Sequence, residues 1–112
     1  MATYEKSSVV KGHHVCKFVW MPVIGQELKT KLEEDNEHDK HAVAVLLDDQ
    51  IVGHLPRSIS RVSRFFLCRG GLIACRVTGK RRHGDGLEVP CVYVYHGLPR
   101  IVKKLHKLLD CY

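Results

Sequence analysis

The chain has 112 residues and a formal net charge of +6 at pH 7, which suits one domain with a buried core and excludes two full-sized domains. No apolar run is long enough to span a bilayer, and the short polar stretch 1–8 lacks the apolar core of a signal peptide. We therefore expect an intracellular protein, of the nucleus or the cytoplasm, without a membrane partner.

The charges are unevenly distributed along the chain. Residues 33–49 are mostly acidic, whereas residues 57–107 hold most of the Lys and Arg. A basic half suggests a polyanionic partner such as nucleic acid, but charge that only keeps a surface soluble gives the same composition. Composition leaves both interpretations open.

The five cysteines are odd in number and form no Cys-x-x-Cys pair, which favours free thiols. Cys16, Cys75 and Cys91 lie among Val, Ile and Tyr residues, where cysteine packs as a small apolar side chain. Cys16 could join His13 and His14 in a zinc site, but the sequence offers no obvious fourth ligand. We expect no cofactor.

The N-terminal third predicts strands. Residues 8–20 are expected to form the first strand or strand pair. Residues 27–32 alternate well enough for another strand, with Leu28, Thr30 and Leu32 on one face.

Residues 42–47 form a run without polar alternation, which predicts a strand covered on both faces. An acidic turn follows at 48–50, and a second strand leads into Gly53-His54-Leu55-Pro56-Arg57. In such a hairpin, the polar loop that precedes residue 42 and the segment after residue 53 lie at the same end. We therefore expect His38 and Asp39 to lie near His54 and Arg57.

Residues 58–69 are predicted to form a helix, with Ser58 as the N-cap and Gly70-Gly71 as the stop. The apolar residues at helical spacing are Ile59, Val62, Phe65 and Phe66. The basic residues form a stripe that begins beside His54: Arg57, Arg61 and Arg64.

The next segment predicts a hairpin. Residues 72–80 alternate as a strand, residues 81–86 form a glycine-containing loop, and residues 88–96 return as the last strand. Pro90 suggests an edge or bulged position in that strand, because proline cannot donate to a sheet ladder.

The C-terminal segment 98–110 predicts an amphipathic helix with Pro99 in its first turn. Such a helix caps the sheet, although a basic amphipathic helix can also lie on a membrane or enter a partner's groove. Short, regularly spaced strands with one inserted helix and one terminal helix predict a mostly β fold, with a strongly bent sheet or a barrel of about six strands.

The residues carry two candidate chemistries. His38, Asp39 and His41 could hold a divalent ion for a metal-dependent hydrolase, but a polar loop whose Asp side chains bond backbone N–H groups has the same sequence. His54 and Arg57 could instead bind phosphate, although His54 could simply pack against the strand end.

Two aromatic residues, Phe18 and Trp20, could stack on bases or belong to the core. No Gly-rich phosphate loop and no Gly-x-Ser-x-Gly elbow occurs in the sequence. We therefore do not expect an enzyme.

Two motifs together resemble the HIRAN domain family. They are Asp35-Asn36-Glu37-His38-Asp39-Lys40-His41-Ala42-Val43-Ala44-Val45 and Val52-Gly53-His54-Leu55-Pro56-Arg57. The resemblance covers roughly residues 8–97 and implies a single domain over 1–112, with an OB-like or SH3-like β-barrel core (8–97) and the C-terminal helix (98–110).

Family members occur at the front of SNF2-type DNA-remodelling ATPases and also alone, and this chain resembles a stand-alone member. The resemblance implies a monomeric module that binds single-stranded DNA at its free 3′ end, as in DNA repair. Asp39 matches the acidic residue near the terminal 3′-hydroxyl, and His38 stands where an aromatic side chain stacks on a base.

Further residues match other parts of the implied site. Asn36, His54 and Arg57 match positions near the phosphates and the end nucleotide. Lys17 and Phe18 fall near a basic–aromatic pair, with an alignment that could slip by one residue. The remaining candidates are Arg61, in the stripe that begins at Arg57, and Leu87, which matches an aromatic on the last hairpin.

This sequence departs from the family pattern at four positions. His38, Leu87 and Val19 replace aromatics, which weakens stacking, and Glu37 replaces a loop proline and adds negative charge beside the expected DNA end. A protein-interaction module on the same fold, which uses the barrel groove or the C-terminal helix, therefore stays open as the alternative.

Overall fold

The computed structural model describes residues 1–12, 21–33, 40–84 and 86–109. Its elements are, in chain order, β1 (Ala2–Gly12), β2 (Glu27–Leu32), β3 (Val43–Leu47), β4 (Gln50–His54), α1 (Arg57–Cys68), β5 (Leu72–Val77), β6 (Arg82–Gly84), β7 (Gly86–Gly97) and α2 (Pro99–Leu109).

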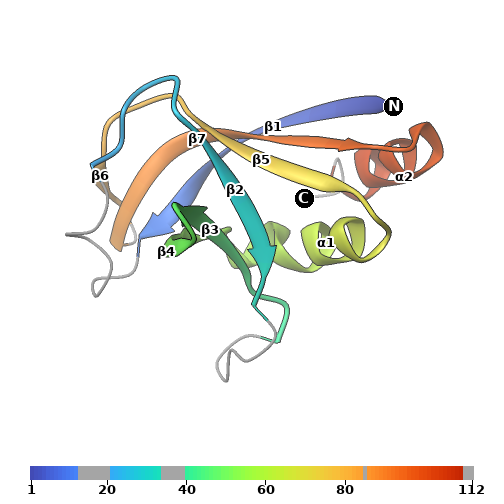
Figure 1. Cartoon of the computed structure of the whole chain (residues 1–112), viewed down its shortest axis with the longest axis horizontal. Coiled ribbons are helices and arrows are strands. Elements are labelled where there is room, and N and C mark those ends of the chain that lie inside the picture. Colours follow the sequence, from blue (N-terminus) through green and yellow to red (C-terminus); the bar gives the residue numbers. More distant parts are fainter. Residues whose placement is uncertain (13–20, 34–39, 85, 110–112) are drawn as a thin grey trace.

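The strands form a closed antiparallel barrel, which confirms the predicted fold class (Figure 1). Six strands follow one another around it in the order β1-β4-β3-β2-β5-β7, and β1 pairs with β7 to close the circle. The short β6 pairs with β7 beyond the end of β5. Both helices lie against the barrel, and α2 sits at the end where β7 finishes (Figure 1).

The first strand was predicted too late in the chain. It begins at Ala2 rather than Ser8 and pairs with β7 along its whole length, from Ala2 opposite Gly97 to Gly12 opposite Leu87. Thr3, Glu5 and Ser7 are exposed and alternate with less exposed residues, as in a strand. One of the less exposed positions is Lys6, so the sequence lacks the regular apolar–polar alternation by which a strand is recognised. The remainder of the predicted strand, residues 13–20, lies outside the described residues.

The β3–β4 hairpin forms as predicted. Asp48 and Asp49 have φ angles of 50° and 66°, as expected for a two-residue type I′ turn, which Asp tolerates better than most residues. Val43, Ala44 and Val45 are all buried, so the first part of β3 is covered on both faces as its sequence predicts.

Pro90 predicted an edge or a bulged position, but β7 is not an edge strand and its pairing with β1 shows no register shift there. β7 lies between β1 on one side and β5 and β6 on the other. Along β7, the pairs with β6 end at Glu88 and the pairs with β5 begin at Cys91. Pro90 lies between them, opposite Val9 of β1. The missing N–H of proline is therefore tolerated in a gap between two neighbouring strands.

Helix α1 ends as predicted but begins differently. Gly70 has a φ of +84°, and the N–H groups of Gly70 and Gly71 donate to Leu67 and Phe66, which is a Schellman motif. The N-cap is Pro56 rather than Ser58, and no side chain caps the helix. With φ −57° and ψ 145°, Pro56 has the extended, non-helical backbone that an N-cap position requires.

The core lies between the inner barrel wall and the two helices. Phe66 of α1 packs edge-on against Tyr95 of β7, with 5.4 Å between ring centroids. The Tyr95 hydroxyl lies 2.7 Å from the Ser63 hydroxyl, which satisfies two buried polar groups. Helix α2 buries Val102, Leu105 and Leu109, as its predicted apolar stripe requires. The buried thiols of Cys75 and Cys91 confirm their prediction as core residues.

Candidate nucleic-acid interface

His54 ends β4 at the seam where the barrel closes. Its backbone pairs with Ala44 of β3 on one side and with Lys11 of β1 on the other. Its ring atom Nε2 contacts Oε2 of Glu33, the residue that follows β2. Both side chains keep 26% of their surface exposed. A carboxylate therefore fixes the orientation of this imidazole while the ring stays accessible from solvent.

The two ends of the 34–39 loop meet beside His54. The N–H of Glu33 donates to the Ala42 carbonyl at 3.0 Å, and the N–H of Leu55 donates to the Val43 carbonyl at 3.0 Å. Glu33, Ala42 and the segment from His54 onward thus lie at the same end of the β3–β4 hairpin. His38 and Asp39 lie outside the described residues, so their expected closeness to His54 and Arg57 stays a prediction.

Helix α1 presents the predicted basic stripe from this end of the barrel. Arg57 is its first residue, and both Arg57 and Arg61 are exposed. Arg64 is half-buried, and its Nη1 donates to the Lys40 carbonyl at 3.1 Å. This bond ties α1 to Lys40, two residues before Ala42.

A second ionic group lies on the other side of β1. Lys11 Nζ pairs with Glu88 Oε2, and Arg82 Nε lies 3.6 Å from Glu88 Oε1. The hydrogen bond from Lys11, together with the charges of Lys11 and Arg82, holds the pKa of the Glu88 carboxyl below its usual value despite desolvation. Glu88 thus offsets one of the two positive charges that Lys11 and Arg82 bring to this rim.

A hollow of about 760 Å³ adjoins Glu33 on the outer side of β2, β3 and β4. Leu46, Ile51 and Leu67 give it apolar walls, and its charged lining is Lys31, Glu33 and Asp49. Two carboxylates against one cation make this hollow poorly suited to phosphate.

Sequence reasoning missed two of the rim residues, Glu33 and Lys11. Glu33 belongs to an acidic run, and Lys11 follows a pair of valines, so neither is distinctive by itself. The strand register brings them to His54 from β1 and from the end of β2, and pairing of this kind is decided in three dimensions.

The match with known proteins decides the family. The model for the HIRAN domain matches residues 19–89 of the chain. The chain belongs to the HIRAN domain family. No curated protein matches its sequence.

Two solved structures resemble this HIRAN domain. The HIRAN domain of human HLTF has a TM-score of 0.73 and 15% identity, with 95% of this chain and 86% of that chain covered. A protein of Lactobacillus plantarum has a TM-score of 0.60 and 14% identity, with 85% of this chain and 100% of that chain covered. At these identities the likeness establishes the fold.

Membership of the HIRAN family implies nucleic-acid binding by a module that is not itself catalytic. Among the described residues, no three His, Cys, Asp or Glu side chains are grouped to hold a metal ion. His38 and Asp39 of the metal hypothesis lie outside that part, as do His13, His14 and Cys16. Over the same described residues, no helix has the length and apolar character to cross a bilayer.

The predicted site residues divide into two groups. Lys17, Phe18, Asn36, His38 and Asp39 lie outside the described residues.

The others lie on the described scaffold of this HIRAN domain. His54 ends β4, and Arg57 and Arg61 lie on α1. The backbone of Leu87 pairs with Gly12 of β1, next to the pair that joins Lys11 and His54. The register thus places Leu87 two strands from His54 at the same end of the barrel.

Proposed function

We propose that this HIRAN domain binds single-stranded DNA and captures its 3′-hydroxyl end at the barrel rim. The observation that carries the proposal is the position of His54. It is held by Glu33, adjoins the base of the 34–39 loop, and lies three residues before the exposed Arg57 at the start of α1. Because Nε2 of His54 is engaged by Glu33, Nδ1 is the ring nitrogen left for a phosphate, and the Arg57 guanidinium can bind a neighbouring phosphate of the same strand.

Asp39 supplies the proposed selectivity for the 3′ end. A carboxylate accepts a hydrogen bond from a hydroxyl but repels a phosphate, so it favours a 3′-hydroxyl over a 3′-phosphate. His38 replaces an aromatic of the family pattern, so we expect end recognition here to depend more on polar contacts than on stacking. The domain would act as a monomer where DNA 3′ ends are exposed, as in DNA repair in the nucleus.

Fluorescence anisotropy with matched oligonucleotides tests this function. The wild type should bind a 3′-hydroxyl strand roughly tenfold more tightly than the same strand with a 3′-phosphate. Asp39→Asn keeps the shape of the side chain and removes its charge, so the difference should shrink. Equal wild-type affinity for both ends would contradict end recognition.

Arg57→Ala should weaken binding to both oligonucleotides, because a phosphate contact carries no end preference. Lys29→Ala is the control, since Lys29 is an exposed cation on β2 rather than on α1. No binding by the wild type at low salt would remove the nucleic-acid function and favour the protein-interaction module instead.

A further inference from the structure

The two helices carry a concentration of positive charge that extends well beyond Arg57 and Arg61 of the proposed 3′-end site. Residues 57–69 and 99–109 hold eight of the 18 Lys and Arg and none of the 12 Asp and Glu. The basic residues are Arg57, Arg61, Arg64, Arg69, Arg100, Lys103, Lys104 and Lys107. The rest of the chain, with 10 Lys and Arg and all 12 acidic residues, has a formal net charge of −2.

A cation from each helical segment meets at a shared aromatic ring. Arg69 and Lys104 both lie over the ring of Phe65, at 4.2 and 5.1 Å from its centroid. Arg69 follows α1 directly and Lys104 belongs to α2, so the two helices meet at this ring. We call the exposed side of α1 and α2 the helical face.

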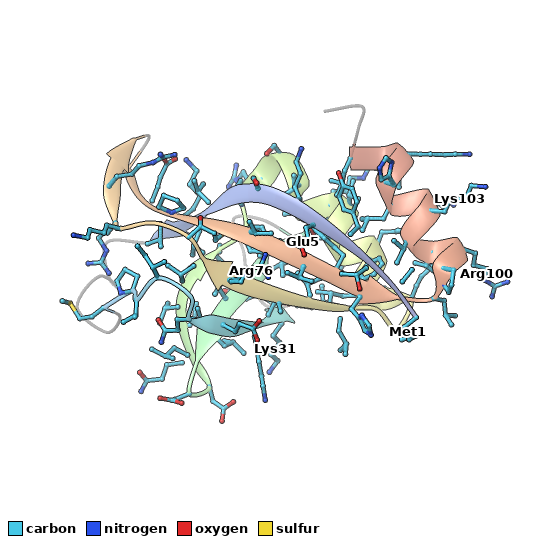
Figure 2. The ribbon with its side chains drawn as sticks, turned by 90° about the horizontal axis from the view of Figure 1, so that it is seen from above. Met1, Glu5, Lys31, Arg76, Arg100 and Lys103 are labelled. Carbon is cyan, nitrogen blue, oxygen red and sulfur yellow. The ribbon has the colours of Figure 1, made fainter. Side chains whose placement is uncertain are left out.

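Each helix buries its apolar side in the core, so its basic side is directed outward. Ile59, Val62 and Phe66 of α1 are buried, so Arg57 and Arg61 point away from the core. All four Lys and Arg of α2 are exposed. Figure 2 shows two of them, Arg100 and Lys103, directed away from the barrel.

The acidic residues are elsewhere in the described structure. Glu5 pairs with Arg76 on the outer side of the sheet, at 3.0 Å, and Glu33 and Glu88 lie at the rim. Asp48 and Asp49 form the β3–β4 turn. The acidic residue next to either helix in sequence is Asp110, which lies outside the described residues. Among the described residues, no acidic side chain forms an ion pair with Arg61, Arg69, Arg100, Lys103 or Lys104.

We infer that the helical face is a second nucleic-acid surface, which binds the phosphodiester backbone of a duplex and requires no free end. Like charges on one face repel one another, and this repulsion is relieved when the face binds phosphates. Binding also releases the counterions condensed on the nucleic acid, which favours the complex. With about 1.5 Å per residue, α1 and α2 extend roughly 18 and 16 Å, which is long enough to follow several phosphates along a duplex.

Base stacking is disfavoured on this face. Two cations already lie over the ring of Phe65 in α1. The exposed ring of α2, His106, packs edge-on against Tyr4, with 4.9 Å between ring centroids. Non-specific single-strand sites combine a basic groove with aromatic rings that are available to bases. The helical face offers charge without such a ring, which suits phosphates on the outside of a duplex.

A bilayer or a protein partner fits the helical face less well. The apolar side of α2 is already buried, with Val102, Leu105 and Leu109 at 7%, 0% and 0% exposure, so the helix has no apolar face to insert into lipid. Protein interfaces usually centre on an accessible aromatic or aliphatic anchor, and the outer side of this face consists mainly of Lys and Arg.

A covalently closed DNA dumbbell tests the inference, because this duplex has no free end. Wild-type binding should be detectable at low salt and should weaken as salt rises. The double variant R100Q/K103Q should make the slope of log affinity against log salt shallower by ~1.8, because each of its two lost phosphate contacts contributes about 0.9 to the slope. Between 50 and 200 mM salt, the affinity advantage of the wild type over this variant should then shrink about tenfold.

The matched control is the double variant K29Q/K31Q. It also removes two positive charges, but from exposed positions of β2, which lie on another part of the surface from Arg100 and Lys103 (Figure 2). Its salt slope should equal that of the wild type. Equal slopes for R100Q/K103Q and K29Q/K31Q would show that only total charge matters and would overturn the inference. Thermal denaturation checks that both variants are folded.

Two further arms identify the ligand. Tighter binding to a closed single-stranded circle than to the dumbbell would overturn the assignment to duplex. Failure to bind the dumbbell would overturn it too. Binding to vesicles of phosphatidylcholine and phosphatidylserine in place of the dumbbell would assign the helical face to a membrane instead. Asp39→Asn should leave dumbbell binding unchanged, so the helical face and the 3′-end site can fail independently.

Discussion

Gly53 is predicted to be essential for closure of the barrel beside His54. It lies in β4, opposite Val45 of β3, one residue before the pair that joins β4 to β1. A Cβ atom added at this position would lie 2.5 Å from Val10 Cγ1 and 2.9 Å from the Lys11 carbonyl oxygen. Gly53→Ala therefore tests whether the glycine of the Val-Gly-His-Leu-Pro motif is there for packing between strands.

The size of the effect follows from these two contacts. Ordinary contacts of a Cβ atom begin at about 3.4 Å, so β1 and β4 would have to separate by roughly half an ångström or more. The Lys11 backbone cannot easily move, because it also pairs with Glu88 of β7. Overpacking of this kind costs about 1–3 kcal/mol, so we expect the free energy of unfolding to fall by that amount.

Urea denaturation followed by circular dichroism measures the loss. The midpoint should fall while the m-value stays constant, and the melting temperature should drop by about 4 °C per kcal/mol. In a double-mutant cycle with Val10→Ala, the two changes should be less than additive, because Val10→Ala removes the nearer contact atom. Wild-type stability of Gly53→Ala, within about 0.5 kcal/mol, would refute the packing argument.

Three further predictions concern buried and ionic pairs. Tyr95→Phe should lower the free energy of unfolding by ~1–3 kcal/mol in urea, because the buried Ser63 hydroxyl loses its partner; unchanged stability would contradict this. Burial raises the pKa of Tyr95 to about 12, so wild-type stability should fall between pH 10 and 12, and this loss should be smaller in Tyr95→Phe when melting temperatures are compared across that range. Because the pKa of Glu88 is lowered, its ionised form stabilises the fold above the usual glutamate pKa, and this stabilisation is lost as pH falls through the folded-state pKa. In Lys11→Met, the free energy of unfolding should therefore fall less steeply as the pH is lowered through this range. An acid denaturation profile identical to that of the wild type would count against the ion pair.

Local patterns were sufficient for most of the elements. Alternation identified β2 and the inward face of β5, where Ile73, Cys75 and Val77 are buried. Helical spacing identified both helices and their buried faces. Two consecutive glycines gave the end of α1. Each of these features depends on neighbours within a few residues, so the chain carries the information locally.

Long-range pairing produced the errors. The start of β1 could not be found from residues 2–7, because β7 selects them as a strand from about ninety residues away. Pro90 suggested an edge, but two short neighbours leave a gap at that point of a central strand. In both cases the partner strand, rather than local preference, determined the outcome.

The sequence alone determined the family, the barrel class and the concentration of cations in the two helical segments, because motif, periodicity and charge are properties of the chain order. Only the tertiary structure decided that Glu33 contacts His54, that Arg64 donates to the Lys40 carbonyl, and that Arg69 and Lys104 meet over the ring of Phe65. These contacts join residues from separate elements, and their geometry depends on how the barrel closes and how the helices pack against it.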